Sequence, residues 1–177
     1  MNEAPASWTS IVATCPAAEQ IVGPWRLELD PSARHGLPAH ITLLAPFVPA
    51  QEIRESDYAA VGDVWAEHAP LDPVLTHVEQ LPGAIALRPD PQTERALAQV
   101  TNALLRHWPQ LRGTVRTGFS RPHHLTVACR EDEALRAAIA SDLAQYLPLS
   151  APLEPATVVV AAASGEIRRL PRIPSAF

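Results

Sequence analysis

Residues 37–44 read LPAHITLL, and residues 121–128 read RPHHLTVA. Both stretches contain Pro, one further residue, His, an apolar residue, Thr and an apolar residue in that order. From the composition alone, His-apolar-Thr-apolar should occur by chance roughly 0.1 times in the chain. The repeat predicts two related structural units, and the alternative is a coincidence of strand composition, because Thr and branched residues favour strands in any case.

Strand geometry gives the repeated pattern a structural meaning. Side chains alternate between the two faces of a strand, so His40 and Thr42 point one way and Ile41 points the other. The same alternation places His124 and Thr126 on one face of the second stretch. If the two copies are duplicates, we expect two lobes related by a pseudo-twofold axis, with the four polar side chains meeting in a shared cleft.

Two imidazoles on opposite sides of a phosphate suit an in-line displacement. One takes a proton from the attacking oxygen while the other gives a proton to the leaving oxygen, and an unperturbed pKa of about 6.5 suits His for either role. The hydroxyls of Thr42 and Thr126 are placed to bind phosphate oxygens. No cluster of Asp or Glu marks a magnesium site, and the predicted chemistry needs neither a metal nor a cofactor.

Composition narrows the class of protein and the class of partner. The 177 residues, 47% hydrophobic and 19% charged, fit a globular protein. We find no secretory signal and no apolar run long enough to cross a bilayer, and we expect a soluble cytoplasmic protein that does not bind membranes. The net charge of −5 argues against duplex DNA as a partner and leaves a small nucleotide or an RNA terminus.

Helical and strand patterns alternate irregularly along the chain. Strands are expected at 8–15, 39–44, 73–80, 84–88, 123–129, 156–163 and 166–170, and helices at 50–68, from Asp90 to Trp108, and from Glu131 to Tyr146. Gly23-Pro24 predicts a kink or two short turns within 16–30, and 31–38 reads as loop. Hairpins without a regular βαβ repeat indicate an α+β fold with antiparallel sheet.

The paired motifs, together with the PAHITLLAPF context and the LPG hairpin at 81–83, resemble the 2H phosphoesterase superfamily, which includes 2′-5′ RNA ligase-like proteins and RNA 2′,3′-cyclic phosphodiesterases. The resemblance covers most of the chain. It implies one domain, residues 1–177, made of two intertwined lobes. Each lobe would hold one antiparallel sheet, with helices outside and a central cleft. It also implies that His40 and His124 are the acid–base pair and that Thr42 and Thr126 bind phosphate.

Several residues near the motifs depart from the family pattern or leave their role open. Many relatives carry a phosphate-binding Arg five residues after the second His, where this chain has Cys129 followed by Arg130. Strand alternation favours Arg130 as a substrate contact unless a bulge intervenes. Leu81 replaces an aromatic residue found in many relatives, and Phe47 and Phe119 are the candidate substitutes for stacking on a base, with core packing as the alternative.

Two other functions compete with a phosphodiesterase. The same fold would serve as a non-catalytic module that binds a nucleotide or RNA-end phosphate. A metal site made by His40 and His124 with His35 or His123 is the third reading, although no carboxylate is placed beside it. The sequence leaves open which His is the acid, and we expect a monomer because one chain already supplies both half-sites.

Overall fold

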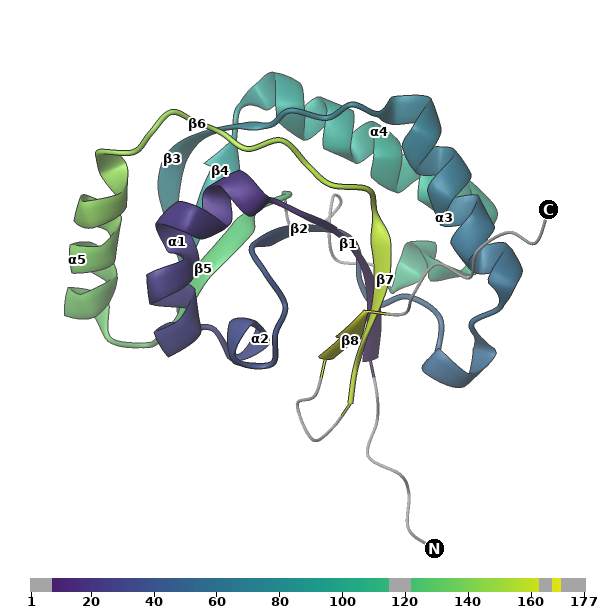
Figure 1. Cartoon of the computed structure of the whole chain (residues 1–177), viewed down its shortest axis with the longest axis horizontal. Coiled ribbons are helices and arrows are strands. Elements are labelled where there is room, and N and C mark those ends of the chain that lie inside the picture. The colour runs from purple at the N-terminus through teal and green to yellow at the C-terminus, as the bar shows by residue number, and fades with distance from the viewer. Residues whose placement is uncertain (1–7, 115–121, 163–166, 170–177) are drawn as a thin grey trace, which may run out of the picture.

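The two repeated stretches form neighbouring strands in the middle of an antiparallel sheet (Figure 1). The computed structural model describes residues 8–114, 122–162 and 167–169. In chain order its elements are β1 (Trp8–Thr14), α1 (Pro16–Leu29), α2 (Pro31–Arg34), β2 (His40–Leu44), η1 (Ala50–Glu52), α3 (Glu55–His68), β3 (Val74–Leu81), β4 (Ala84–Pro89), α4 (Pro91–His107), η2 (Pro109–Gly113), β5 (Leu125–Cys129), α5 (Glu133–Ala144), β6 (Leu149–Ser150), β7 (Thr157–Ala161) and β8 (Ile167–Arg169).

The strands form one sheet in the order β6-β3-β4-β5-β2-β1-β7-β8. The motif strands β2 and β5 are neighbours at its centre, paired antiparallel with Ile41 opposite Leu125. Four strands therefore lie on each side of this junction, counting the motif strand itself. The two sheets predicted from the sequence are the two halves of one continuous sheet, and the mixed α+β class is confirmed.

Each half contains the same unit of strand, helix and motif strand. The first unit is β1-α1-β2 and the second is β4-α4-β5, and in both the first strand pairs antiparallel with the motif strand. The helices are exchanged between the units, because α1 packs against β5 and α4 packs against β2. Figure 1 shows α1 and α5 along one end of the sheet and α3 and α4 along the other.

The helices cover a single face of the central strands. Ile41, Leu43, Leu125 and Val127 are fully buried in a core that also holds apolar residues of α1, α3, α4 and α5. The opposite face presents the side chains that alternate with these, and we call it the motif face: His40, Thr42, His124 and Thr126, all partly exposed. Burying apolar side chains on one face leaves the polar half of each motif available to a ligand.

Helix α1 differs from the sequence prediction, because it runs without interruption through Gly23-Pro24. The proline removes one backbone hydrogen bond, yet α1 buries Ala18, Val22 and Leu29 against the core. Tertiary packing thus outweighs the local signal. In the opposite direction, residues 31–34 form a single helical turn where a loop was predicted, because the Asp30 side chain caps that turn at the Ser32 amide.

The starts of two other helices lie close to where the sequence predicted them. Asp90 accepts hydrogen bonds from the amides of Gln92 and Thr93 at the start of α4, and the side chain of Asp132 caps α5 at the Leu135 amide. The hairpin between β3 and β4 turns at Gly83, whose φ of +72° favours glycine. A Cβ there would also lie 2.6 Å from Oε1 of Glu131.

The remaining differences concern element ends. The helix predicted at 50–68 begins at Glu55, after the short turn η1. Tyr146, the last residue of the predicted helix, follows the end of α5 and is exposed. The short strand β6 was not predicted, and the connection between the last two predicted strands lies outside the described residues. Within the described ranges, no helix has the length and apolar content needed to span a bilayer.

Candidate active site

The four motif side chains come together across the β2–β5 junction. Around the Ile41–Leu125 pair, the antiparallel register sets His40 across from Thr126 and Thr42 across from His124. The two histidines are therefore diagonal neighbours, a relation that separates Cβ atoms by about 7–8 Å on paired strands.

Both motif strands carry a β-bulge immediately after the Thr. The register shifts between Ile11 and Val12 against β2, and between Ile85 and Ala86 against β5. As a result two successive residues are buried in each strand, Leu43 with Leu44 and Val127 with Ala128. The alternation of side chains between the two faces of the sheet, counted from each histidine, therefore holds only as far as the Thr.

The bulge in β5 corrects the argument made for Arg130. Beyond the bulge, the exposed position that follows the buried pair is Cys129, and Arg130 lies just after the strand with its side chain exposed. Strand alternation thus no longer favours Arg130, whose contact with substrate stays a prediction. Of the two cysteines, Cys129 is exposed and Cys15 is buried.

The two histidine rings are each oriented by an equivalent hydrogen bond to the proline two residues earlier in the chain. Nδ1 of His40 lies 2.8 Å from the carbonyl oxygen of Pro38, and Nδ1 of His124 lies 2.9 Å from that of Pro122. A carbonyl only accepts, so each Nδ1 carries the proton. Each Nε2 is then the atom that gains or loses a proton, which explains why Pro recurs two residues before each His.

His40 has surroundings that disfavour its charged form. Burial of the ring lowers the pKa of His40 from 6.5 to about 4, and the positive charge of Arg26 acts in the same direction. The hydrogen bond to Pro38 and the negative charge of Asp30 oppose this shift without cancelling it. At neutral pH, the Nε2 of His40 is therefore unprotonated and available to accept a proton.

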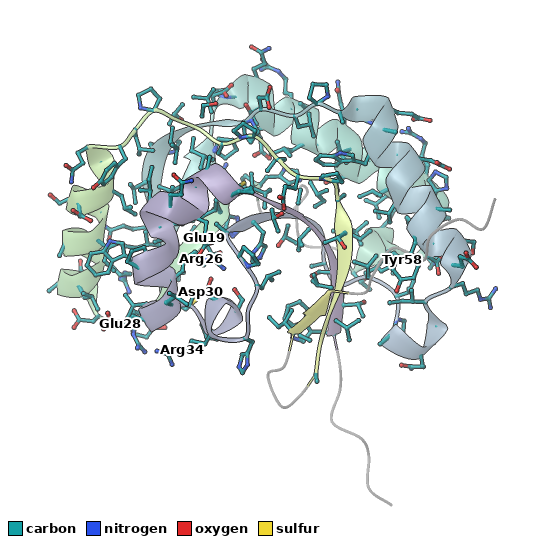
Figure 2. All side chains as sticks on the ribbon, in the orientation of Figure 1. Glu19, Arg26, Glu28, Asp30, Arg34 and Tyr58 are labelled. Atoms are coloured by element: carbon teal, nitrogen blue, oxygen red, sulfur yellow. The ribbon has the colours of Figure 1, made fainter. Side chains whose placement is uncertain are left out.

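A buried ion-pair network lies behind the first motif. Arg26, fully buried in α1, contacts Glu19 at 3.0 Å and Asp30 at 2.9 Å (Figure 2). Its guanidinium also donates to the carbonyl of Leu37 at 3.0 Å, and Glu19 accepts the amide of Ala39. The network therefore holds the backbone on both sides of Pro38.

A second buried network lies behind the other motif. The ring of His123 is fully buried, with Nδ1 2.9 Å from Oε1 of Glu94 and Nε2 2.9 Å from Oγ1 of Thr101. The Thr101 hydroxyl donates its proton to the carbonyl of Leu43, so it accepts from His123. Burial would raise the pKa of Glu94, but the hydrogen bonds from His123 outweigh it and leave that pKa lowered. Both ring nitrogens of His123 are therefore held by hydrogen bonds inside the core.

The structure decides between the alternatives for several other candidates. Phe47 is buried and packs edge-on against Trp108, with ring centroids 4.8 Å apart, so it belongs to the core and does not stack on a substrate base. Phe119 lies outside the described residues. His123 faces away from the motif face, as expected, and His35 is exposed at the end of α2. In the described part of the chain, no group of three or more His, Cys, Asp or Glu is placed to hold a metal ion.

Glu19 and Glu94 are the residues of this region that the sequence prediction missed. Their partners lie 20 and 29 positions further along the chain, which no local pattern reveals. One signal was present: each Glu follows a proline by three positions at the start of a helix, Pro16 in α1 and Pro91 in α4.

Comparison with known proteins places this geometry in a class. The model of the 2′-5′ RNA ligase superfamily matches residues 14–164. The E. coli LigT structure in complex with NADP+ matches with a TM-score of 0.51 at 19% identity, covering 96% of this chain and 95% of that one. The E. coli LigT structure with ATP gives 0.49 at 17% identity, covering 94% and 95%. No curated protein matches significantly.

A sheet that presents two His-x-Thr strands side by side is the arrangement expected of a 2H phosphoesterase, and that resemblance is confirmed. The family match covers most of the chain. The chain belongs to the 2′-5′ RNA ligase superfamily.

Proposed function

We propose that the protein is a metal-independent phosphodiesterase that hydrolyses 2′,3′-cyclic phosphates, or 2′-5′ linkages, at nucleotides or RNA ends. The observation that carries the proposal is the matched pair of hydrogen bonds from the histidine Nδ1 atoms to the carbonyl oxygens of Pro38 and Pro122. These bonds leave Nε2 of His40 and Nε2 of His124, both on the motif face, as the atoms that can exchange a proton. Membership of the superfamily supports a phosphodiester of RNA as the substrate class.

The proposed reaction uses one histidine on each side of the phosphorus. Nε2 of His40 takes a proton from water as the water oxygen bonds to phosphorus, because His40 is neutral at neutral pH. Nε2 of His124 gives its proton to the ribose oxygen as the P–O bond to that oxygen breaks. One water is consumed, and a proton passes from His40 to His124 before the next turnover. Each transfer is worth about 10²–10⁴-fold in rate.

Thr42 and Thr126 complete the proposed site. Each Thr lies across the junction from the histidine of the other strand, which supports the proposal that its hydroxyl donates to a non-bridging phosphate oxygen. One chain holds both half-sites, which is why we propose a monomer with two intertwined lobes. A nucleotide or RNA terminus in the cytoplasm is the proposed partner, without duplex DNA or membrane.

The deciding experiment is hydrolysis of 2′,3′-cyclic nucleotides in EDTA by the wild type, His40→Ala and His124→Ala. We expect turnover by the wild type and a loss of at least about 10²-fold in kcat for each variant. His35→Ala serves as the control, because it removes an exposed histidine near the first motif. A folded wild type that binds the nucleotides without turnover would support a binding module instead.

A further inference from the structure

Glu19 and Glu94 make the same contact in the two half-sites. A carboxylate oxygen of Glu19 accepts the backbone amide of Ala39, the residue before His40. Oε1 of Glu94 accepts the amide of His123, the residue before His124, at 3.1 Å. Each glutamate is the fourth residue of its helix, and α1 and α4 occupy equivalent places in the two repeated units.

The amide held by each glutamate belongs to the peptide group that orients the histidine. The N–H of Ala39 and the C=O of Pro38 are the two ends of one planar peptide unit. Its N–H donates to Glu19, and its C=O accepts from Nδ1 of His40. The peptide between Pro122 and His123 connects Glu94 to Nδ1 of His124 in the same way. Each half-site thus contains a chain of carboxylate, peptide and imidazole.

In such a chain of hydrogen bonds, each bond strengthens the next. A carboxylate on the amide hydrogen polarises the peptide, which makes the carbonyl oxygen a better acceptor for the Nδ1 proton. The ring is thereby held as the Nδ1–H tautomer, and its imidazolium form is stabilised. The effect resembles that of a carboxylate placed directly on Nδ1, with one peptide group interposed.

Each carboxylate is also held by a second, buried side chain. The same Glu19 oxygen that accepts the Ala39 amide accepts Nη1 of Arg26, and the same Glu94 oxygen lies 2.9 Å from Nδ1 of His123. Arg26 and His123 are both fully buried. The second hydrogen bond limits the rotamers of each carboxylate and keeps its oxygen on the peptide amide.

We propose that Glu19 and Glu94 are a matched pair of positioning residues, each acting on a motif histidine through the intervening Pro-X peptide. The inference rests on the proposed function for its catalytic consequence and on the contacts alone for its effect on the rings. Neither glutamate touches the substrate. Each fixes the tautomer and direction of one imidazole.

The test combines kinetics with ¹⁵N NMR of the histidine rings in Glu19→Ala, Glu94→Ala, Glu19→Gln and Glu94→Gln. We expect Nδ1 of His40 and His124 to carry the proton in the wild type. Each Ala variant should shift only the ring of its own half-site toward a mixture of tautomers. Its kcat on a 2′,3′-cyclic nucleotide should fall about 10–100-fold, with KM changed less than about threefold. Gln keeps an oxygen acceptor without the charge, so it should lose less.

Glu28→Ala is the matched control, because Glu28 lies on α1 with an exposed side chain and should change neither ring nor rate. Folded Ala variants with wild-type tautomers and kcat within twofold of the wild type would overturn the proposal. If an Ala variant does not fold, the ring signals of the Gln variant decide. If the wild type is inactive yet the tautomers shift as expected, the proposed function fails while the positioning role stands.

Discussion

His40 and His124 share one tautomer but differ in their surroundings. Arg26 is close enough to His40 to disfavour a second positive charge, and the ring is also poorly solvated. Of the two imidazoles on the motif face, the ring of His40 is therefore one that resists protonation. This difference distinguishes two histidines that the motifs leave equivalent, and within the proposed reaction it favours His40 as the base.

The low pKa of His40 predicts an acid-tolerant enzyme. A base must be unprotonated, and His40 stays so until the pH approaches about 4. The acidic limb of kcat/KM should therefore lie well below pH 6.5, where an ordinary histidine would lose activity. The measurement is the pH profile of the wild type on a cyclic nucleotide, with Arg26→Gln for comparison. An acidic limb near 6.5 in the wild type would contradict this assignment.

The same shift links pH to stability. Unfolded His40 gains a proton below pH 6.5, while the folded protein takes it up only near pH 4. The fold should therefore lose on the order of 3 kcal/mol as the pH falls through this window, and nothing from this source above it. Urea unfolding of the wild type and His40→Gln at pH 7 and pH 4.5 measures the difference. Equal losses in the two proteins would refute the prediction.

Phe47 illustrates what a residue pattern leaves undecided. Its position after the first motif fits either stacking on a base or packing in the core, and only its contact with Trp108 decides. Phe47→Ala should lower the free energy of unfolding by about 3–5 kcal/mol. The KM of the folded variant should not change. If the variant instead keeps the wild-type free energy of unfolding and its KM rises, Phe47 is a substrate contact after all. Unfolding curves and KM on one preparation make the test.

At the scale of elements, sequence predicts what is local and misses what is not. Strand alternation placed His40 and Thr42 on one face, and Asp90 marked the start of α4, because each depends on neighbours in the chain. The β-bulges and the continuous α1 depend on packing against distant strands. The argument for Arg130 failed for that reason, because the extra residue of the bulge moves every later side chain of β5 to the opposite face of the sheet.

A substitution in helix α1 should lower kcat without lowering the stability of the fold. A Cβ on Gly23 would lie 2.9 Å from Oε1 of Glu19, and that oxygen ends a flexible side chain. Gly23→Ala should therefore fold, aided by about 1 kcal/mol of helix propensity, while Glu19 is displaced. We expect a lower kcat with an unchanged or higher Tm. Gly113→Ala is the control, because a Cβ there meets nothing within 4 Å.

At the scale of the molecule, the two halves are joined by more than the short β2–β5 pairing. Exchange of α1 and α4 places each helix against the other unit's motif strand. The repeat in the sequence predicted two related units and a pseudo-twofold arrangement. It did not predict one continuous sheet or the exchange, because neither follows from the order of elements along the chain.

Thr101 is the polar contact that spans this junction. It lies on α4, donates to the Leu43 carbonyl of β2 and accepts from His123, which precedes the second motif. Thr101→Val keeps the shape of the side chain and removes both hydrogen bonds. The Leu43 carbonyl and Nε2 of His123 then each lose that hydrogen bond inside the core, at about 1–3 kcal/mol each.

We therefore expect Thr101→Val to lower the free energy of unfolding by roughly 2–6 kcal/mol. Because the lost bonds connect β2 to the start of β5, kcat should fall as well, with little change in KM. Urea unfolding and cyclic-nucleotide kinetics measure the two effects. Thr76→Val is the matched control, since Thr76 is exposed on β3, far from the junction in the strand order. Equal behaviour of the two variants would mean that the half-sites are held together by apolar packing alone.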